Sequence, residues 1–162
     1  METNNFDLRP YGVNPAKGRD YESIMYVFAL IYNRLQTRVD AYFAACGLSA
    51  VQFNLLMLAA YQNKGQGISQ VQAATHLIAS ASNITKLVEK SVQEKLLTRQ
   101  TNPNSRRENI ICITKKGQAL IDKVWPGYDR LMRNLTGKIP AKNRPQMEQI
   151  LKNWFVALQE EK

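Results

Sequence analysis

The side chains between Ser80 and Gln93 have the spacing of a helix with one polar face. Apolar residues recur there at intervals of three, one and four positions: Ile84, Leu87, Val88 and Val92. The opposite face carries hydrogen-bonding and charged side chains: Asn83, Thr85, Lys86, Glu89, Lys90 and Gln93. A helix buried on one side and polar on the other fits the major groove of DNA, where such side chains hydrogen-bond to base edges. The pattern predicts a recognition helix.

Candidate DNA contacts gather at the exposed start of this predicted helix. The side chains expected to contact bases or phosphates are Ser82, Asn83, Thr85 and Lys86. Lys90, about one turn further along, is a candidate phosphate contact, and a plain solvated position is the equal alternative. Ser80 is expected to cap the helix without touching DNA.

A β-hairpin is predicted directly after the helix. Leu96–Thr101 and Asn109–Ile113 alternate in polarity or are β-branched, and they flank the turn-forming sequence Asn-Pro-Asn-Ser at 102–105. The tip of this hairpin is expected to hold Arg106 and Arg107. Arginine there has the reach and charge for the minor groove, whose negative potential is greatest where it is narrow and A·T-rich. The hairpin is therefore predicted to act as a DNA-binding wing.

The charge of the chain also favours a polyanionic partner. The 162 residues include 22 Lys or Arg against 13 Asp or Glu, which gives a formal net charge of +9. More than half of the excess lies between Ser80 and Lys116, where eight Lys or Arg face three Glu. The 44% hydrophobic fraction is ordinary for a globular domain with a core. Double-stranded DNA is the predicted partner.

Two helices are predicted before the DNA-binding segment. Residues 1–19 contain prolines and glycines that favour an extended N-terminal arm. A long helix is expected from Asp20, its N-cap, to Gly47, with apolar residues at helical spacing: Ile24, Val27, Phe28, Ile31, Leu35, Val39 and Phe43. Ser49 is the expected N-cap of the second helix.

A short helix is predicted between these helices and the recognition helix. Its apolar positions are Ile68, Val71, Ala74 and Leu77, and Ser69 is the expected N-cap. Its end is separated from the next helix by little more than Ala79. So short a connection is typical of a helix-turn-helix.

Two further helices complete the predicted chain. Thr114 is expected to cap a helix that contains Pro126, which removes one backbone hydrogen bond and favours a kink. The last helix carries an apolar stripe at i, i+3, i+4 and i+7 spacing: Met147, Ile150, Leu151, Trp154, Phe155 and Leu158. Together with the long first helix, this stripe predicts a homodimer interface, with packing inside one chain as the alternative.

The combined pattern resembles the MarR family of bacterial transcription regulators. The resemblance rests on four motifs: SxSxxTKLV at 80–88, LxR at 97–99, SRR at 105–107 and ITxxG at 113–117. It covers 20–162 as a single domain and implies a mainly α fold with a small β-hairpin wing. In that fold, a winged helix-turn-helix lobe at 49–117 is joined to dimerisation helices at 20–47 and 118–162. It also implies a dimeric repressor that small phenolic ligands or oxidation release from DNA.

Three positions depart from the family pattern. Ser105 replaces the acidic residue that usually precedes the arginine pair, so the ion pair that would orient Arg107 is missing. Lys95 replaces a glycine between recognition helix and wing, so the backbone either avoids positive φ there or tolerates strain. Ser91 replaces a leucine, and Val92 is expected to take over its packing.

Effector residues are implied by the same resemblance. Ligands of the family commonly lie between the dimerisation helices and the DNA-binding lobe, at positions that correspond to Leu30, Asn33, Ala50 and Tyr128. None of these is cationic, so a neutral or aromatic ligand is favoured over a carboxylate. Plain core packing is the simpler interpretation of all four residues.

The remaining residues indicate neither catalysis nor metal binding. Cys46 and Cys112 lie far apart and form no CxxC motif, and a redox role is not expected for either. His76 has no nearby partner for catalysis, and no nucleotide-binding or metalloprotease motif occurs. We therefore expect a cytoplasmic non-enzyme without cofactor, metal or membrane attachment. The alternative function is a winged helix module that binds proteins and lacks specific DNA binding.

Overall fold

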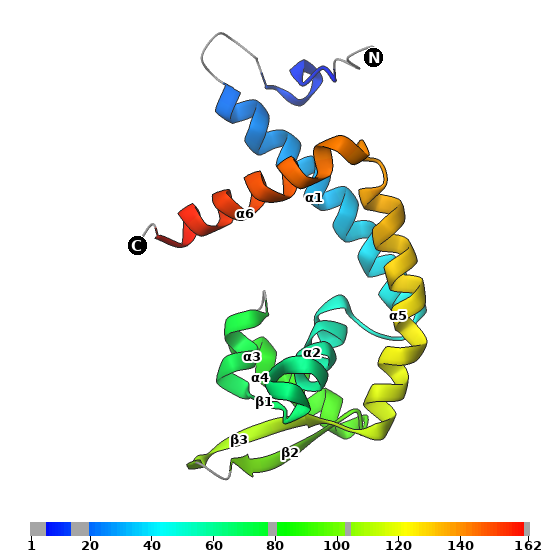
Figure 1. Ribbon diagram of the computed structural model, residues 1–162, viewed down its shortest axis with the longest axis vertical. Helices are drawn as coiled ribbons and strands as arrows, with labels where there is room; N and C mark the ends of the chain where they lie inside the picture. Colours follow the sequence, from blue (N-terminus) through cyan, green and yellow to red (C-terminus); the bar gives the residue numbers. More distant parts are fainter. Residues whose placement is uncertain (1–5, 14–19, 78–80, 103–104, 161–162) are drawn as a thin grey trace. The chain divides into compact units, whose positions relative to one another are not determined.

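The computed structural model describes residues 6–13, 20–77, 81–102 and 105–160 (Figure 1). The chain divides into two compact units, Met1–Asn54 and Leu55–Lys162. Helices predominate, and a small antiparallel sheet lies in the second unit. This confirms the predicted fold class, mainly α with a small wing.

The first unit is dominated by α1 (Asp20–Ala45). The helix ends in a Schellman motif, in which Gly47 has a φ of 73°. The Gly47 N–H donates to Ala44 O at 3.0 Å, and the Leu48 N–H donates to Phe43 O at 2.9 Å. These bonds satisfy carbonyl groups that the end of a helix would otherwise leave unpaired. The predicted end of the long helix is confirmed.

The described part of the N-terminal arm is not extended, contrary to expectation. It forms η1 (Arg9–Tyr11), a 3₁₀ turn that ends at Gly12 with a φ of 79°. Pro10 favours this turn because its φ is already near the helical value and its missing N–H is not needed at the start of a helix. Leu8 and Val13, on either side of the turn, are buried.

Most of the apolar stripe of α1 is exposed. Phe43 is the buried residue of this helix, and its ring packs against Phe53 with centroids 4.8 Å apart. The side chains nearer the start of the helix are between 40 and 55% exposed: Ile24, Phe28, Ile31 and Leu35. Further exposed apolar or aromatic side chains on α1 are Tyr21, Met25 and Tyr32. A single chain thus leaves a long apolar helix surface in contact with water.

The helix α2 (Ala50–Tyr61) runs from the first unit into the second. Ser49 is its N-cap as predicted, because the Gln52 N–H donates to Ser49 Oγ at 3.1 Å. The helix is followed by η2 (Gln62–Gly65), in which Asn63 and Lys64 have positive φ values of 48° and 55°. This tight turn leads the chain into the sheet.

The sheet of the second unit has three strands in the order β1-β3-β2, all antiparallel. The strands are β1 (Ile68–Ser69), β2 (Leu97–Asn102) and β3 (Ser105–Ile113). The assignment of Ile68 to the short helix is therefore wrong, since it pairs with Ile111 of β3. Gly67, at a φ of 85°, makes this pairing possible: a Cβ there would lie 2.5 Å from Ile111 O.

Four helices accompany the sheet in the second unit after α2 (Figure 1). They are α3 (Gln70–His76), α4 (Ala81–Gln93), α5 (Lys115–Thr136) and α6 (Arg144–Glu160), with a 3₁₀ turn, η3 (Ala141–Asn143), before the last. Pro126 lies inside α5, which continues past it. The predicted turn of the helix-turn-helix, including Ala79 and Ser80, lies outside the described residues.

The last helix is as uncovered as the first. Met147 and Trp154 of α6 are half-buried, and the rest of its predicted apolar stripe is exposed: Ile150, Leu151, Phe155 and Leu158. Within the described residues, no single helix is long and apolar enough to cross a membrane. In the same part of the chain, one pair of segments, α1 and Ala50–Gly65, meets the length and composition test together, but the two are bent by 75° at the break between them.

Candidate nucleic-acid interface

The recognition helix predicted from the sequence is α4, and its two faces differ as expected. Ile84 and Val88 are fully buried, whereas Asn83, Lys86 and Lys90 are exposed. Glu89 and Gln93 are exposed as well. Ser82 lies in α4, but its side chain is outside what the structure describes. The exposed row is polar and faces away from the core, as major-groove contact requires.

The buried face of α4 differs from the prediction at one position. Ser91 is fully buried, whereas Val92, which was expected to replace it in the core, is only half-buried. Ser91 follows Ile84 and Val88 at helical spacing, so its position puts it in the core despite its polarity. Its hydroxyl donates to Leu87 O at 2.8 Å, so this polar atom is hydrogen-bonded within its own helix although it is buried.

Thr85 is less exposed than the polar residues Asn83 and Lys86, and it links two helices. Gln70 Nε2, at the start of α3, donates to Thr85 Oγ1 at 2.7 Å. The bond joins residues fifteen positions apart, so it connects the two helices of the helix-turn-helix near the exposed start of α4. Thr85 is therefore held in place at the edge of the polar face.

Lys90 belongs to an ion pair on the surface of α4. Its Nζ lies 3.8 Å from Glu94 Oε1, with 56 and 41% of the two side chains exposed. An exposed pair of this kind contributes at most about 1 kcal/mol, and salt screens it. Lys90 thus remains accessible to a phosphate, because only the weak ion pair with Glu94 would have to break.

The end of α4 is a Schellman motif without glycine. Lys95 has a φ of 59°, its N–H donates to Val92 O, and the Leu96 N–H donates to Ser91 O, both at 2.9 Å. Of the two alternatives raised for Lys95, tolerated strain is the correct one. The backbone of Lys95 adopts the left-handed conformation although its Cβ is crowded there by the backbone.

The start of α5 is hydrogen-bonded to the end of α4. Thr114 is the predicted N-cap, since its Oγ1 accepts from the Gly117 N–H at 2.9 Å, and the same hydroxyl donates to Lys95 O at 2.8 Å. Lys116 Nζ donates to Glu94 O at 2.8 Å. The ITxxG motif therefore joins the recognition helix, the base of the wing and α5 at one point, which we call the α4–α5 junction.

The wing is longer on its second strand than predicted. Arg106 and Arg107 were expected at the tip of the hairpin, before a second strand beginning at Asn109; the backbone places both in β3 itself, because Asn102 already pairs with Ser105. Their side chains and the turn residues Pro103 and Asn104 lie outside the described part of the structure. The arginine pair still follows directly after the turn, as a wing contact requires.

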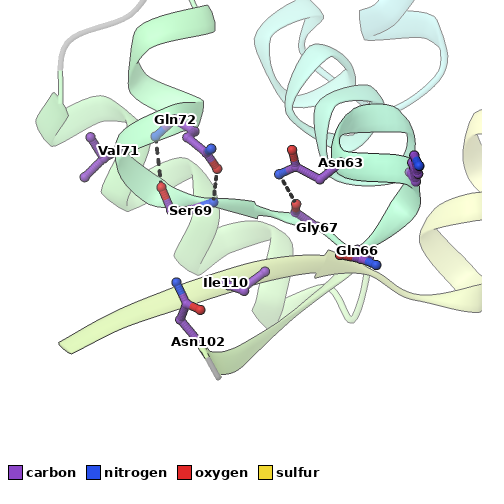
Figure 2. Close-up of a pocket in the computed structure, with 9 residues that line it drawn as sticks. Asn63, Gln66, Gly67, Ser69, Val71, Gln72, Asn102 and Ile110 are labelled. Atoms are coloured by element: carbon purple, nitrogen blue, oxygen red, sulfur yellow. Dashed lines mark hydrogen bonds between the residues drawn. The ribbon is translucent and has the colours of Figure 1, made fainter. Parts of the chain in front are cut away.

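A polar cleft of about 740 Å³ lies between the wing and the start of α3 (Figure 2). Its described lining comes from the turn after α2, from α3 with its N-cap, and from the wing: Asn63, Lys64, Gln66, Gly67, Ser69, Val71, Gln72, Asn102 and Ile110. Sequence reasoning missed this cleft because its walls come from three separate segments. It contains one cation and several amides, and none of these nine residues is acidic.

The residues implied as effector contacts are not brought together within one unit. Leu30, Asn33 and Ala50 belong to the first unit and Tyr128 to the second. Leu30 and Ala50 are half-buried, and Asn33 is exposed. The ring of Tyr128 lies 5.8 Å from that of Trp125, which lines a smaller cleft of about 430 Å³ between α2 and α5.

Cys112 and His76 each lie next to a backbone carbonyl oxygen. Burial raises the pKa of the Cys112 thiol, and its Sγ lies 3.6 Å from Gln66 O, so this cysteine is not activated as a thiolate. The ring Nδ1 of His76 lies 2.8 Å from Gln72 O, one turn back on the same helix. Among the described residues, no cluster of three potential metal ligands occurs.

Known proteins with similar sequence or structure are regulators of transcription. No family model matches the chain. It is 26% identical over 102 residues to the HTH-type transcriptional regulator MhqR of Bacillus subtilis (strain 168). The aligned segment covers 63% of this chain and 68% of MhqR.

Two solved structures extend the likeness to most of the chain. One is a MarR family transcriptional regulator from Streptomyces coelicolor in complex with DNA, with a TM-score of 0.81, 14% identity, and 88 and 90% of the two chains covered. The other is CouR from Rhodococcus jostii RHA1 bound to p-coumaroyl-CoA, with a TM-score of 0.70, 24% identity, and 80 and 89% covered. These likenesses establish the winged helix fold.

Proposed function

We propose that this chain, which has the winged helix-turn-helix fold of the MarR family, is a sequence-specific transcriptional regulator that binds double-stranded DNA. One observation carries the proposal. The helix α4 is anchored through Ile84 and Val88, presents a polar opposite face, and is followed directly by a wing with two arginines near its turn. Major-groove and minor-groove contacts from adjacent elements are what such a lobe supplies.

The contacts divide by chemistry. The start of α4 enters the major groove, where base edges or phosphates are contacted by Ser82, Asn83, Thr85 and Lys86. Lys90, further along the helix, contacts a phosphate. Arg106 and Arg107 reach from the wing into the adjacent minor groove, where negative potential favours arginine. Base contacts provide selection, and phosphate contacts provide affinity that depends on salt.

The regulator acts as a homodimer. The exposed apolar surfaces of α1 and α6 support this, since contiguous apolar surfaces of this extent are rare on monomers. Side chains such as Phe28, Ile31, Ile150 and Phe155 would be covered by a second copy. Two recognition helices related by a two-fold axis sit about 34 Å apart and read a pseudo-palindrome. Such a dimer, bound over a promoter in the cytoplasm, represses the adjacent gene.

A small neutral or aromatic ligand releases the dimer from DNA. The proposed contacts remain Leu30, Asn33, Ala50 and Tyr128, which are apolar, aromatic or uncharged. The structural likeness to CouR, bound to p-coumaroyl-CoA, supports a site for an aromatic effector in a fold of this kind.

Selection of duplexes from a random pool by the purified full chain tests the proposed function. The expected result is one enriched pseudo-palindrome whose affinity falls steeply as salt rises. A pool without an enriched palindrome, or binding indifferent to salt, would point instead to a winged helix module that binds proteins. Size measurement of the complex then gives the number of chains on each duplex.

A further inference from the structure

The polar cleft lies between the wing and the start of α3, the helix that is hydrogen-bonded to the start of α4. On one side, Ser69 and Gln72 flank Gln70, whose amide holds Thr85 at the exposed start of α4. On the other side, Asn102 lies next to the turn of the wing and pairs with Ser105, directly before the arginine pair. Figure 2 shows how the wing and the start of α3 form the two walls. The cleft thus adjoins the wing on one side and, on the other, the helix start that holds Thr85 of α4.

The geometry of a duplex determines what must occupy this gap. The major and minor grooves are separated everywhere by one sugar-phosphate strand. If α4 enters one groove and the wing enters the next, the strand between those grooves passes over the surface that joins α4 to the wing. The cleft opens beside that path, between the wing and the start of α3, and its chemistry decides whether it can hold a phosphodiester.

The lining suits a phosphodiester well. Lys64 supplies a positive charge, and the nine described lining residues include no carboxylate. Ser69 and Gln72 form a capping box: the Gln72 N–H donates to Ser69 Oγ at 3.1 Å, and the Ser69 N–H donates to Gln72 Oε1 at 2.9 Å. The box uses the oxygen of the Gln72 amide, and among the described residues its Nε2 makes no hydrogen bond. A side-chain amide and a lysine are ordinary phosphate contacts.

We propose that this cleft is a DNA-backbone site, in which Gln72 Nε2 and Lys64 Nζ bind the phosphates of the strand that runs between the two contacted grooves. The proposal rests on the proposed function and adds a third point of contact to it. The site contributes affinity and register but no base selection, because phosphates are the same at every base pair.

The substitution Gln72→Glu separates this role from a structural one. A glutamate at this position of a capping box still accepts from the Ser69 N–H, so the start of α3 keeps its stability. The new carboxylate, however, repels a phosphate. Melting temperature should therefore stay level or rise, while affinity for the duplex selected by the wild type falls about fivefold to tenfold.

The matched control is Asn54→Asp, which makes the same amide-to-carboxylate change on the exposed surface of α2, at a residue outside the proposed DNA, effector and dimer contacts. Its affinity for the duplex should stay within about twofold of wild type. Lys64→Gln should lower the slope of log affinity against log salt by about one. Neither cleft variant should alter the base preferences recovered from a random pool, and an altered preference would overturn the proposal.

A phosphate scan identifies the contact itself. Uncharged methylphosphonates are placed one at a time along the selected duplex, and each modified duplex is titrated with wild type and Gln72→Glu. At one phosphate between the two contacted grooves, the modification should remove most of the difference between the two proteins. Additive losses at every phosphate would refute the site. Failure of the proposed function is distinct, because then the wild type would select no duplex.

A free phosphate-bearing ligand is the other source of the same chemistry. Inorganic phosphate is added at constant ionic strength to the complexes formed by wild type and Gln72→Glu. The proposal expects equal effects on both. If phosphate displaces DNA from the wild type alone, the cleft binds a free ligand and the backbone assignment is wrong.

Discussion

Replacing Lys95 by glycine is expected to stabilise the protein. Lys95 ends α4 at a φ of 59°, a left-handed conformation in which its Cβ is crowded by the backbone. Gly47 ends α1 at a φ of 73° with the same two hydrogen bonds of the Schellman motif. The chain therefore contains the motif once with glycine and once with lysine, and only the second carries the strain.

The size of the effect follows from two opposing terms. A non-glycine residue in this conformation costs on the order of 1–2 kcal/mol. Glycine has more freedom in the unfolded chain, which offsets about 0.5–1 kcal/mol of that gain. The Lys95 side chain is exposed, so its loss removes little packing. The net increase in the free energy of unfolding is about 0.5–1 kcal/mol. At roughly 2–4 °C per kcal/mol for a chain of this length, Tm should rise by about 1–4 °C.

Urea unfolding of the wild type, Lys95→Gly and Lys95→Ala measures this difference. The alanine variant removes the charge but keeps the Cβ, so the gap between glycine and alanine isolates the backbone strain. Protein concentration must be identical throughout, because association stabilises by mass action. Equal urea midpoints for the glycine and alanine variants, at unchanged m values, would refute the idea that this helix end stores strain.

Three further outcomes are expected. Gly117→Ala should lower stability by about 1–3 kcal/mol in thermal unfolding, because its Cβ would lie 2.2 Å from Leu96 O, and a Tm equal to wild type would contradict this. Arg107→Ala should weaken binding to the selected duplex by at least about 1 kcal/mol in a titration at physiological salt, and unchanged affinity would remove the wing from the mechanism. Burial raises the pKa of the Cys112 thiol, so in a Cys46→Ser variant iodoacetamide should alkylate Cys112 more slowly at neutral pH than it alkylates a free peptide cysteine. The rate should rise at alkaline pH, and fast labelling at pH 7 would argue for an activated thiol.

Helix ends were the features that the sequence predicted best. Ser49, Ser69 and Thr114 were each expected to be N-caps, and each accepts the hydrogen bond of a nearby backbone N–H. Gly47 was expected to end α1, and it does so in a left-handed conformation. All of these interactions join residues within a few positions of one another, so short spacing contains the necessary information. The predicted resemblance to the MarR family is confirmed in the fold.

Features that depend on tertiary pairing were harder to predict. The strand β1 has two residues, and only its partner Ile111 makes it a strand, so no periodicity could reveal it. The burial of Ser91 was missed because its polarity was weighed above its spacing from Ile84 and Val88. The polar cleft required the wing to be placed against α3, which pattern alone does not provide.

The α4–α5 junction explains why the missing acidic residue at Ser105 leaves the wing in place. At this junction β2 begins and β3 ends; the Thr114 hydroxyl donates to Lys95 O, and the Thr114 N–H donates to Leu96 O at 3.1 Å. The Cα of Gly117 packs so closely against the same carbonyl that no side chain fits between them. The direction of the wing relative to α4 is thus set at its base, by bonds that involve no residue near the turn. An ion pair from position 105 would act only near the turn, whereas the strand that carries the arginine pair is held by the junction.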